Sequence, residues 1–102
     1  MRMSKPIVDK AEVSIDFPDK FYHGSFGRSS RYDVEVDEQG VHIVLDRPGE
    51  ERRHVAFHLH HHLFSSMLEA LAEEFKGAKK VPPQYLEQLK DAISELDHAL
   101  NK

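Results

Sequence analysis

Histidines are the residues of this chain whose type and spacing could do chemistry. His42 is isolated in the sequence, and five further histidines lie close to one another at His54, His58, His60, His61 and His62. Neutral imidazole is a common ligand of zinc, copper and nickel. His58 and His62 have the four-residue spacing with which one helix face can hold an ion, whereas His58, His60 and His62 share a face if the segment stays extended. These three residues are therefore the candidate ligands of a divalent transition metal such as zinc.

A second interpretation of the same histidines requires no cofactor. The imidazoles would cover a strand–helix corner with half-buried rings, or form a contact that responds to pH. The run contains no acidic residue that would complete a metalloprotease-type motif, and the nearest downstream acid is Glu69. We take the cofactor-free corner as the prediction, and the metal site as its alternative.

The segment from Lys20 to Arg31 is a second candidate site, because basic and aromatic residues are interleaved there without an acid. Aromatic rings stack on bases and guanidinium groups pair with phosphates. Arg28 and Arg31 are therefore the candidate residues for weak binding of a phosphate ligand or of single-stranded nucleic acid. We take as the prediction that the aromatic residues belong to the core or its edge and that the arginines pair with the acids at positions 33, 35 and 37, and we keep the binding site as its alternative. The net charge of −4 argues against nucleic acid as a partner.

No catalytic motif is recognisable in the sequence. The chain has no cysteine, no Gly-Xxx-Ser-Xxx-Gly elbow and no paired carboxylates in apolar surroundings. Its acids fall on segments whose pattern indicates exposure to solvent, where the pKa of a catalytic group is not tuned. We therefore expect the protein not to be an enzyme.

Alternating apolar and polar residues predict the strands that lead to the histidines. Such segments occupy residues 13–17, 32–37, 41–46 and 54–59. Residues 20–27 have no clear period, so the pattern does not decide between a further strand and a loop. If the apolar residues on either side of Pro48-Gly49 face one another, Ile43 pairs with Val55 and His42 lies opposite Ala56.

Two amphipathic helices are predicted after the strands. The first carries one apolar stripe, and the second carries an apolar seam at steps of three and four residues. The seam consists of Leu86, Leu89, Ile93, Leu96 and Leu100. It is about two heptads long, which is too short for an independent coiled coil, so it must pack within the chain or on a second subunit. Leu89, Ile93 and Leu96 are the candidate dimer contact, since the opposite face of this helix is acidic.

The predicted fold is α+β, an antiparallel meander of three to four strands followed by two helices packed on one face. The 102 residues are expected to form one domain. Residues 1–11 would be a loose lead-in, 12–59 the sheet, and 60–76 and 82–101 the helices.

The composition predicts where the protein works and with what. No apolar run is long enough for a signal peptide or a membrane span, and cysteine is absent, so we expect a cytoplasmic protein without a membrane partner. The predicted function is that of a small non-enzymatic interaction or accessory protein, whose partner is another protein or a second copy of the chain. The alternatives are a histidine-rich metal-binding or metal-responsive module, and a weak binder of phosphate ligands or single-stranded nucleic acid.

Overall fold

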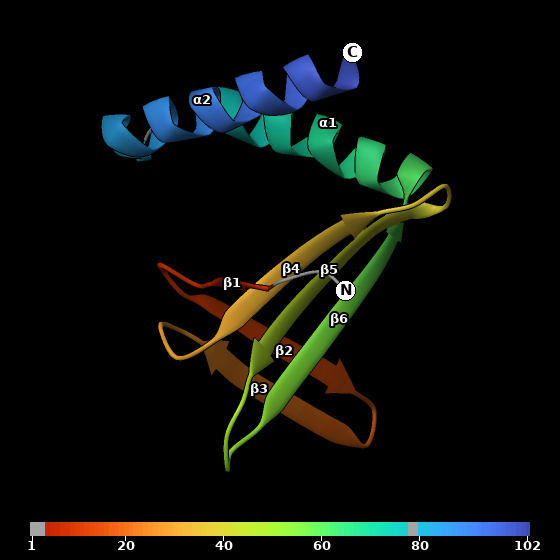
Figure 1. The fold of residues 1–102 in the computed structure, drawn as a ribbon, viewed down its shortest axis with the longest axis vertical. Coiled ribbons are helices and arrows are strands. Elements are labelled where there is room, and N and C mark those ends of the chain that lie inside the picture. Colours follow the sequence, from red (N-terminus) through yellow and green to blue (C-terminus); the bar gives the residue numbers. More distant parts are fainter. Residues whose placement is uncertain (1–3, 78–79) are drawn as a thin grey trace. The chain divides into compact units, whose positions relative to one another are not determined.

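The computed structural model describes residues 4–77 and 80–102, and within these ranges six strands precede two helices (Figure 1). The strands are β1 (Lys5–Pro6), β2 (Ala11–Phe17), β3 (Lys20–Phe26), β4 (Arg31–Val36), β5 (Gly40–Arg47) and β6 (Arg53–His60), and the helices are α1 (His61–Gly77) and α2 (Pro83–Leu100). Every strand pair is antiparallel, so the predicted α+β class is confirmed. Residues 1–3 of the predicted lead-in lie outside the described residues.

Two compact units make up the chain, Met1–Met67 and Leu68–Lys102. The first unit contains all the described strands, and the boundary between the units falls inside α1. The packing of the helices on one face of the sheet stays a prediction.

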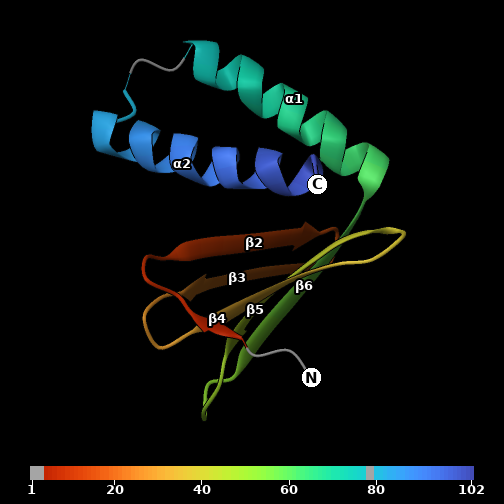
Figure 2. The same ribbon diagram turned by 45° about the horizontal axis from the view of Figure 1, so that its top comes forward.

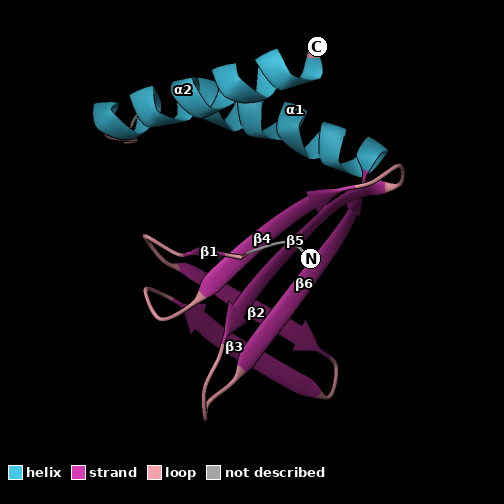
Figure 3. Cartoon of the chain, in the orientation of Figure 1, coloured by secondary structure: helices cyan, strands magenta, loops and turns pink. Residues whose placement is uncertain are grey.

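The strands form two sheets (Figure 3). One has four strands in the order β1-β4-β5-β6, and the other is the β2-β3 hairpin. Three of the strands predicted for the meander lie in the four-stranded sheet as β4, β5 and β6. The strand predicted over residues 13–17 is β2, which instead pairs with β3 in the other sheet. β1 adds a short edge to the four-stranded sheet from within the predicted lead-in, where Lys5 pairs with Tyr32. Residues 20–27, for which the sequence pattern did not decide between a strand and a loop, contain the strand β3.

The register of β5 and β6 corrects the predicted one by two residues. Ile43 lies opposite Phe57 instead of Val55, and His42 lies opposite His58 instead of Ala56. The cause is the turn, because residues 48–52 form a loop centred one residue beyond Pro48-Gly49. Gly49 takes a φ of 115° in this loop, a conformation that favours glycine. A shift of two residues keeps every side chain on its predicted face but changes its neighbours.

The core of the first unit is small. Among the described residues, Phe26 of β3 and Val41 of β5 are its buried large apolar side chains. Figures 1 and 2 show the β2-β3 hairpin beside the larger sheet, and the Arg53 Nη1 of β6 donates a hydrogen bond to the Ser25 carbonyl at 3.0 Å. An open cavity of about 380 Å³ is lined by residues of β2, β3 and β6. The two sheets are therefore joined by a few contacts and not by a filled interior.

Ser30, in the turn between β3 and β4, is the most buried polar residue of the described chain, with 1% of its surface exposed. Its backbone N–H donates to the Gly27 carbonyl at 2.9 Å, and its carbonyl accepts from the Ile7 N–H at 3.1 Å. Its hydroxyl has no hydrogen-bond partner among the described residues. The backbone bonds of Ser30, and not its hydroxyl, thus hold the end of β1 against this turn.

Both helices agree with their predicted bounds to within one residue. α2 begins at Pro83, where the missing N–H has no intrahelical partner to lose. At its end the Asn101 side-chain amide donates to the Asp97 carbonyl at 2.7 Å. In the described chain, no residue of α1 or α2 is buried.

Neither described helix is long and apolar enough to cross a membrane.

Gly40, the first residue of β5, has the closest surroundings of the glycines in the described chain. A Cβ at this position would overlap the Leu59 carbonyl oxygen of β6 and lie 2.8 Å from the His60 Cα. Gly40→Ala should therefore force β5 and β6 apart and lower the free energy of unfolding by about 1–3 kcal/mol, as measured by urea denaturation. Gly27→Ala is the matched control, because nothing lies within 4 Å of its added Cβ. Equal losses in the two variants would contradict this account of Gly40.

Candidate functional site

Three imidazoles lie in a row on one face of the larger sheet, and we call His42, His58 and His60 the histidine row. The ring centroids of His42 and His58 are 3.9 Å apart, with 15° between the ring planes. Those of His58 and His60 are 4.7 Å apart, with 33° between the planes. The register brings the first pair together across two strands, and the two-residue period of β6 brings the second pair together along one strand.

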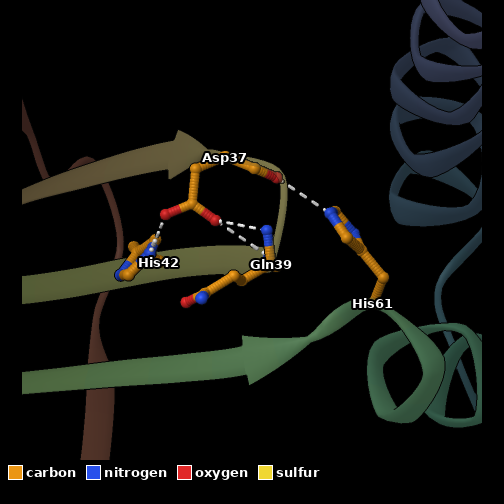
Figure 4. Close-up of polar contacts among 5 residues, drawn as sticks. Asp37, Gln39, His42 and His61 are labelled. Atoms are coloured by element: carbon orange, nitrogen blue, oxygen red, sulfur yellow. Dashed lines mark hydrogen bonds and ion pairs between the residues drawn. The ribbon is translucent and has the colours of Figure 1, made fainter.

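Asp37 lies at one end of this row, in the turn between β4 and β5 (Figure 4). Its Oδ1 accepts hydrogen bonds from the backbone N–H groups of Gln39 at 2.8 Å and Gly40 at 3.0 Å. Its Oδ2 accepts a hydrogen bond from the His42 Nε2 at 2.8 Å. These bonds lower the pKa of Asp37 from 3.8 to about 2, with the Gln39 N–H contributing most, then His42, then Gly40. Asp37 is therefore a carboxylate at neutral pH.

His61 anchors the same turn from the first residue of α1. Its backbone N–H donates to the Gln39 carbonyl at 3.2 Å, and its Nε2 donates to the Asp37 carbonyl at 2.9 Å (Figure 4). The imidazole of His61 thus has a structural partner, and the turn is bonded to β5 on one side and to the start of α1 on the other.

The predicted metal ligands fall on two different elements. His58 and His60 share a face of β6, as the extended alternative requires, whereas His62 is the second residue of α1. No ring contact joins His62 to the other two in the described part of the chain. The backbone carbonyl of His62 accepts a hydrogen bond from the Ser66 hydroxyl at 3.1 Å.

The structure instead gathers a carboxylate and two histidines that the sequence pattern did not single out as a set. One ligating atom each from Asp37, His42 and His58 lies within 4.8 Å of the other two. A hollow of about 350 Å³ adjoins this set and is lined by Glu35, Val36, Asp37 and His42. The correct register would have revealed the set in the sequence, because it alone places His42 opposite His58.

The two arginines of the candidate anion site have different surroundings. The guanidinium of Arg31, at the start of β4, donates from Nε to the Ser4 hydroxyl at 2.7 Å and from Nη2 to the Ser4 carbonyl. Arg28 lies exposed in the preceding turn. Of the aromatic residues of this segment, Phe26 is buried, whereas Phe21 and Tyr22 are exposed. Arg31 therefore fastens the residues before β1 to β4, and anion binding by Arg28 and Arg31 stays a prediction.

The helical seam, Leu86, Leu89, Ile93, Leu96 and Leu100, is the second surface that could carry a function. Its exposed fractions range from 37% at Leu86 to 76% at Leu100. The predicted contact residues Leu89, Ile93 and Leu96 lie in the middle of the seam and are 40%, 60% and 46% exposed. Such values are high for large apolar side chains spaced along one stripe of a helix.

Comparison with protein-family models, with curated proteins and with solved structures found no match to this chain. Its function therefore has to be inferred from the helical seam and the histidine row themselves.

The Asp37 carboxylate should make the stability of the fold depend on acid pH. Because its pKa is lower in the folded chain than in the unfolded chain, it stabilises the fold fully above about pH 4, and this contribution is lost as the pH falls toward about 2. Asp37→Asn keeps an acceptor oxygen in the turn but removes the charge. We expect the variant to melt at a lower temperature than the wild type at about pH 6, and the difference to shrink at about pH 2.

Circular dichroism melts in the presence of EDTA measure this difference without interference from bound metal. A difference in melting temperature that persists unchanged down to about pH 2 would contradict a role for the Asp37 charge.

Proposed function

We propose that this chain is a small non-enzymatic interaction or accessory protein that works in the cytoplasm as a homodimer, with the helical seam as its contact surface. The observation that carries the proposal is the exposure of the whole seam in a helix that has no buried residue. The cytoplasmic location rests on the sequence, which has neither cysteine nor a long apolar run.

The length of the helices supports a packing partner. α1 has 17 residues and α2 has 18. Isolated helices of about this length are marginal in water, and most of the stability of a helix in a protein comes from packing its apolar face. The seam of α2 therefore needs an apolar surface to cover it.

The size of the exposed apolar surface fits a second copy of the chain. Nine large apolar side chains of the described residues 68–77 and 80–102 are exposed, and they are Leu68, Leu71, Phe75, Tyr85, Leu86, Leu89, Ile93, Leu96 and Leu100. If each exposes about half of roughly 200 Å², their summed surface is on the order of 900 Å², near the ~800 Å² per partner of a standard interface.

Charges beside the seam indicate how two copies would pair. On a helical projection, Lys90 and Asp97 flank the seam on one side, and Ala92 and Ala99 flank it on the other. In an antiparallel pair of α2 helices the residues of equivalent flanks face each other, so Lys90 of each copy meets Asp97 of the other. Asp97 therefore lies beside the seam and not on the acidic face opposite to it. This charge complementarity favours self-association in an antiparallel arrangement.

Reversing these charges tests both the dimer and its direction. Lys90→Glu alone and Asp97→Lys alone each replace two attractive pairs by two repulsive ones, so the dimer dissociation constant should rise about tenfold. The double variant Lys90→Glu/Asp97→Lys restores opposite charges and should restore the dimer. Light scattering after size exclusion, with wild-type protein as the reference, measures the mass. Asp91→Lys, on the opposite face of α2, is the control and should leave it unchanged.

A charge inside the seam tests whether the seam is the contact at all. Ile93→Asp or Leu96→Asp should convert the dimer into a monomer, because a carboxylate cannot be buried there without a partner. If either variant keeps the wild-type mass and only loses stability, the seam packs within one chain and the proposal is wrong. A wild-type protein that is monomeric at high micromolar concentration would overturn it directly.

A further inference from the structure

We infer that Asp37, His42 and His58 form a binding site for one divalent transition-metal ion, of which zinc is the expected one. The inference is independent of the proposed dimer, because the three residues lie in the turn before β5, in β5 and in β6. It also differs from the set that the sequence predicts, since two of its three residues lie outside the histidine run.

The distances within the set are close to those that an ion requires. A tetrahedral zinc ion binds nitrogen and oxygen ligands at about 2.0–2.2 Å, which places the ligand atoms roughly 3.3 Å from each other. Here the Asp37 Oδ2 and the His42 Nε2 are 2.8 Å apart, and atoms of all three residues lie within 4.8 Å of one another. Small side-chain rotations therefore suffice to surround an ion.

The hydrogen bond between Asp37 and His42 marks the place of the ion. In the metal-free chain, the proton on the His42 Nε2 bridges the two side chains at 2.8 Å. When an ion binds to Nε2, this proton moves to Nδ1, and the lone pair of Nε2 faces the ion. The ion thereby takes the position of the bridging proton, between a carboxylate oxygen and an imidazole nitrogen.

The fold holds each of the three ligands in advance. The Oδ1 of Asp37 is occupied by the N–H groups of Gln39 and Gly40, which fixes the carboxylate and directs Oδ2 toward His42. His42 and His58 are directly opposed in the register, and their rings already lie side by side at 3.9 Å. Binding requires only that the rings tilt from their nearly parallel arrangement, so that both nitrogens point at one ion.

The chemistry of the donors indicates the class of ion. Two imidazoles and one carboxylate suit zinc and its neighbours, whereas calcium and magnesium prefer oxygen ligands. Three protein ligands leave one tetrahedral position for water. Glu35 lies opposite His42 in the register and lines the adjoining hollow, which adds a second carboxylate near the ion.

The same sheet offers a natural comparison for this site. His54 donates from Nδ1 to the Asp46 Oδ1 at 3.2 Å, so it forms a second histidine–aspartate pair between β5 and β6. Among the described residues, no third ligating side chain joins that pair in a group able to hold an ion. The pair should therefore not hold zinc with comparable affinity.

Titration of the full chain with zinc chloride tests the inference, using protein purified without a metal column and treated with EDTA. Calorimetry should give one equivalent of tightly bound zinc, and cobalt in its place should give the visible spectrum of a four-coordinate ion. His42→Ala and His58→Ala should each weaken binding about 100-fold or more. His54→Ala and His62→Ala, the controls, should stay within about twofold of the wild type.

Three outcomes would overturn the inference. The first is several weak equivalents of zinc with no single tight one. The second is equal losses of affinity in the His62→Ala variant and the His58→Ala variant, which would place the ion on the histidine run. The third is unchanged affinity in Asp37→Asn. Melting curves of each metal-free variant establish that it is folded, and His58→Gln replaces any alanine variant that is not.

Discussion

The close approach of the β6 backbone to Gly40 is the constraint on which the larger sheet depends. No side chain fits between Gly40 and the Leu59 carbonyl, and this close contact helps to fix the register of the two strands. One residue further along, Val41 is buried opposite Leu59, and the next step sets His42 opposite His58. The absence of a side chain at Gly40 therefore affects both the packing of the core on one face of the sheet and the grouping of imidazoles on the other.

The two units of the chain gain their stability in different ways. In the first, backbone ladders between antiparallel strands and a polar turn around Asp37 supplement a core that is small for its length. In the second, helix is the only regular structure among the described residues, and no described side chain is buried. Hydrogen bonds within a helix contribute little net stability, because the same groups bond to water in the unfolded chain. The stability of the second unit therefore depends on its apolar face, whereas the stability of the sheet depends on the backbone hydrogen bonds between its strands.

The sequence pattern was sufficient to locate most of the helices and strands but not to predict how the strands pair. Period-two alternation located β2, β4, β5 and β6, and steps of three and four located α1 and α2 to within one residue. β3 was undecided because its apolar residues do not alternate, and both Phe21 and Tyr22 are exposed in the structure. β1 has only two residues and owes its existence to pairing with β4, which no local pattern records.

The candidate metal site was missed for a related reason. Its residues come from three separate segments, so their meeting depends on where the loop between β5 and β6 is centred. Pro48-Gly49 marks this loop correctly, but the pattern does not state how many residues precede and follow its midpoint. The predicted register was wrong by two residues, so it placed Ala56 and not His58 opposite His42. Asp37 was therefore interpreted as one of several acids on a solvated face. The chemistry of each residue could be inferred from the sequence, whereas the meeting of these three side chains could be seen only in the fold.

The buried hydroxyl of Ser30 gives the chain an internal reporter position. Since Ser30 Oγ makes no hydrogen bond within the described residues and the sequence contains no cysteine, Ser30→Cys would introduce one thiol of similar size, shielded in the folded state. A thiol reagent can reach such a group only when the turn between β3 and β4 opens. The rate of labelling would then follow the local opening of this corner separately from the unfolding of the whole chain.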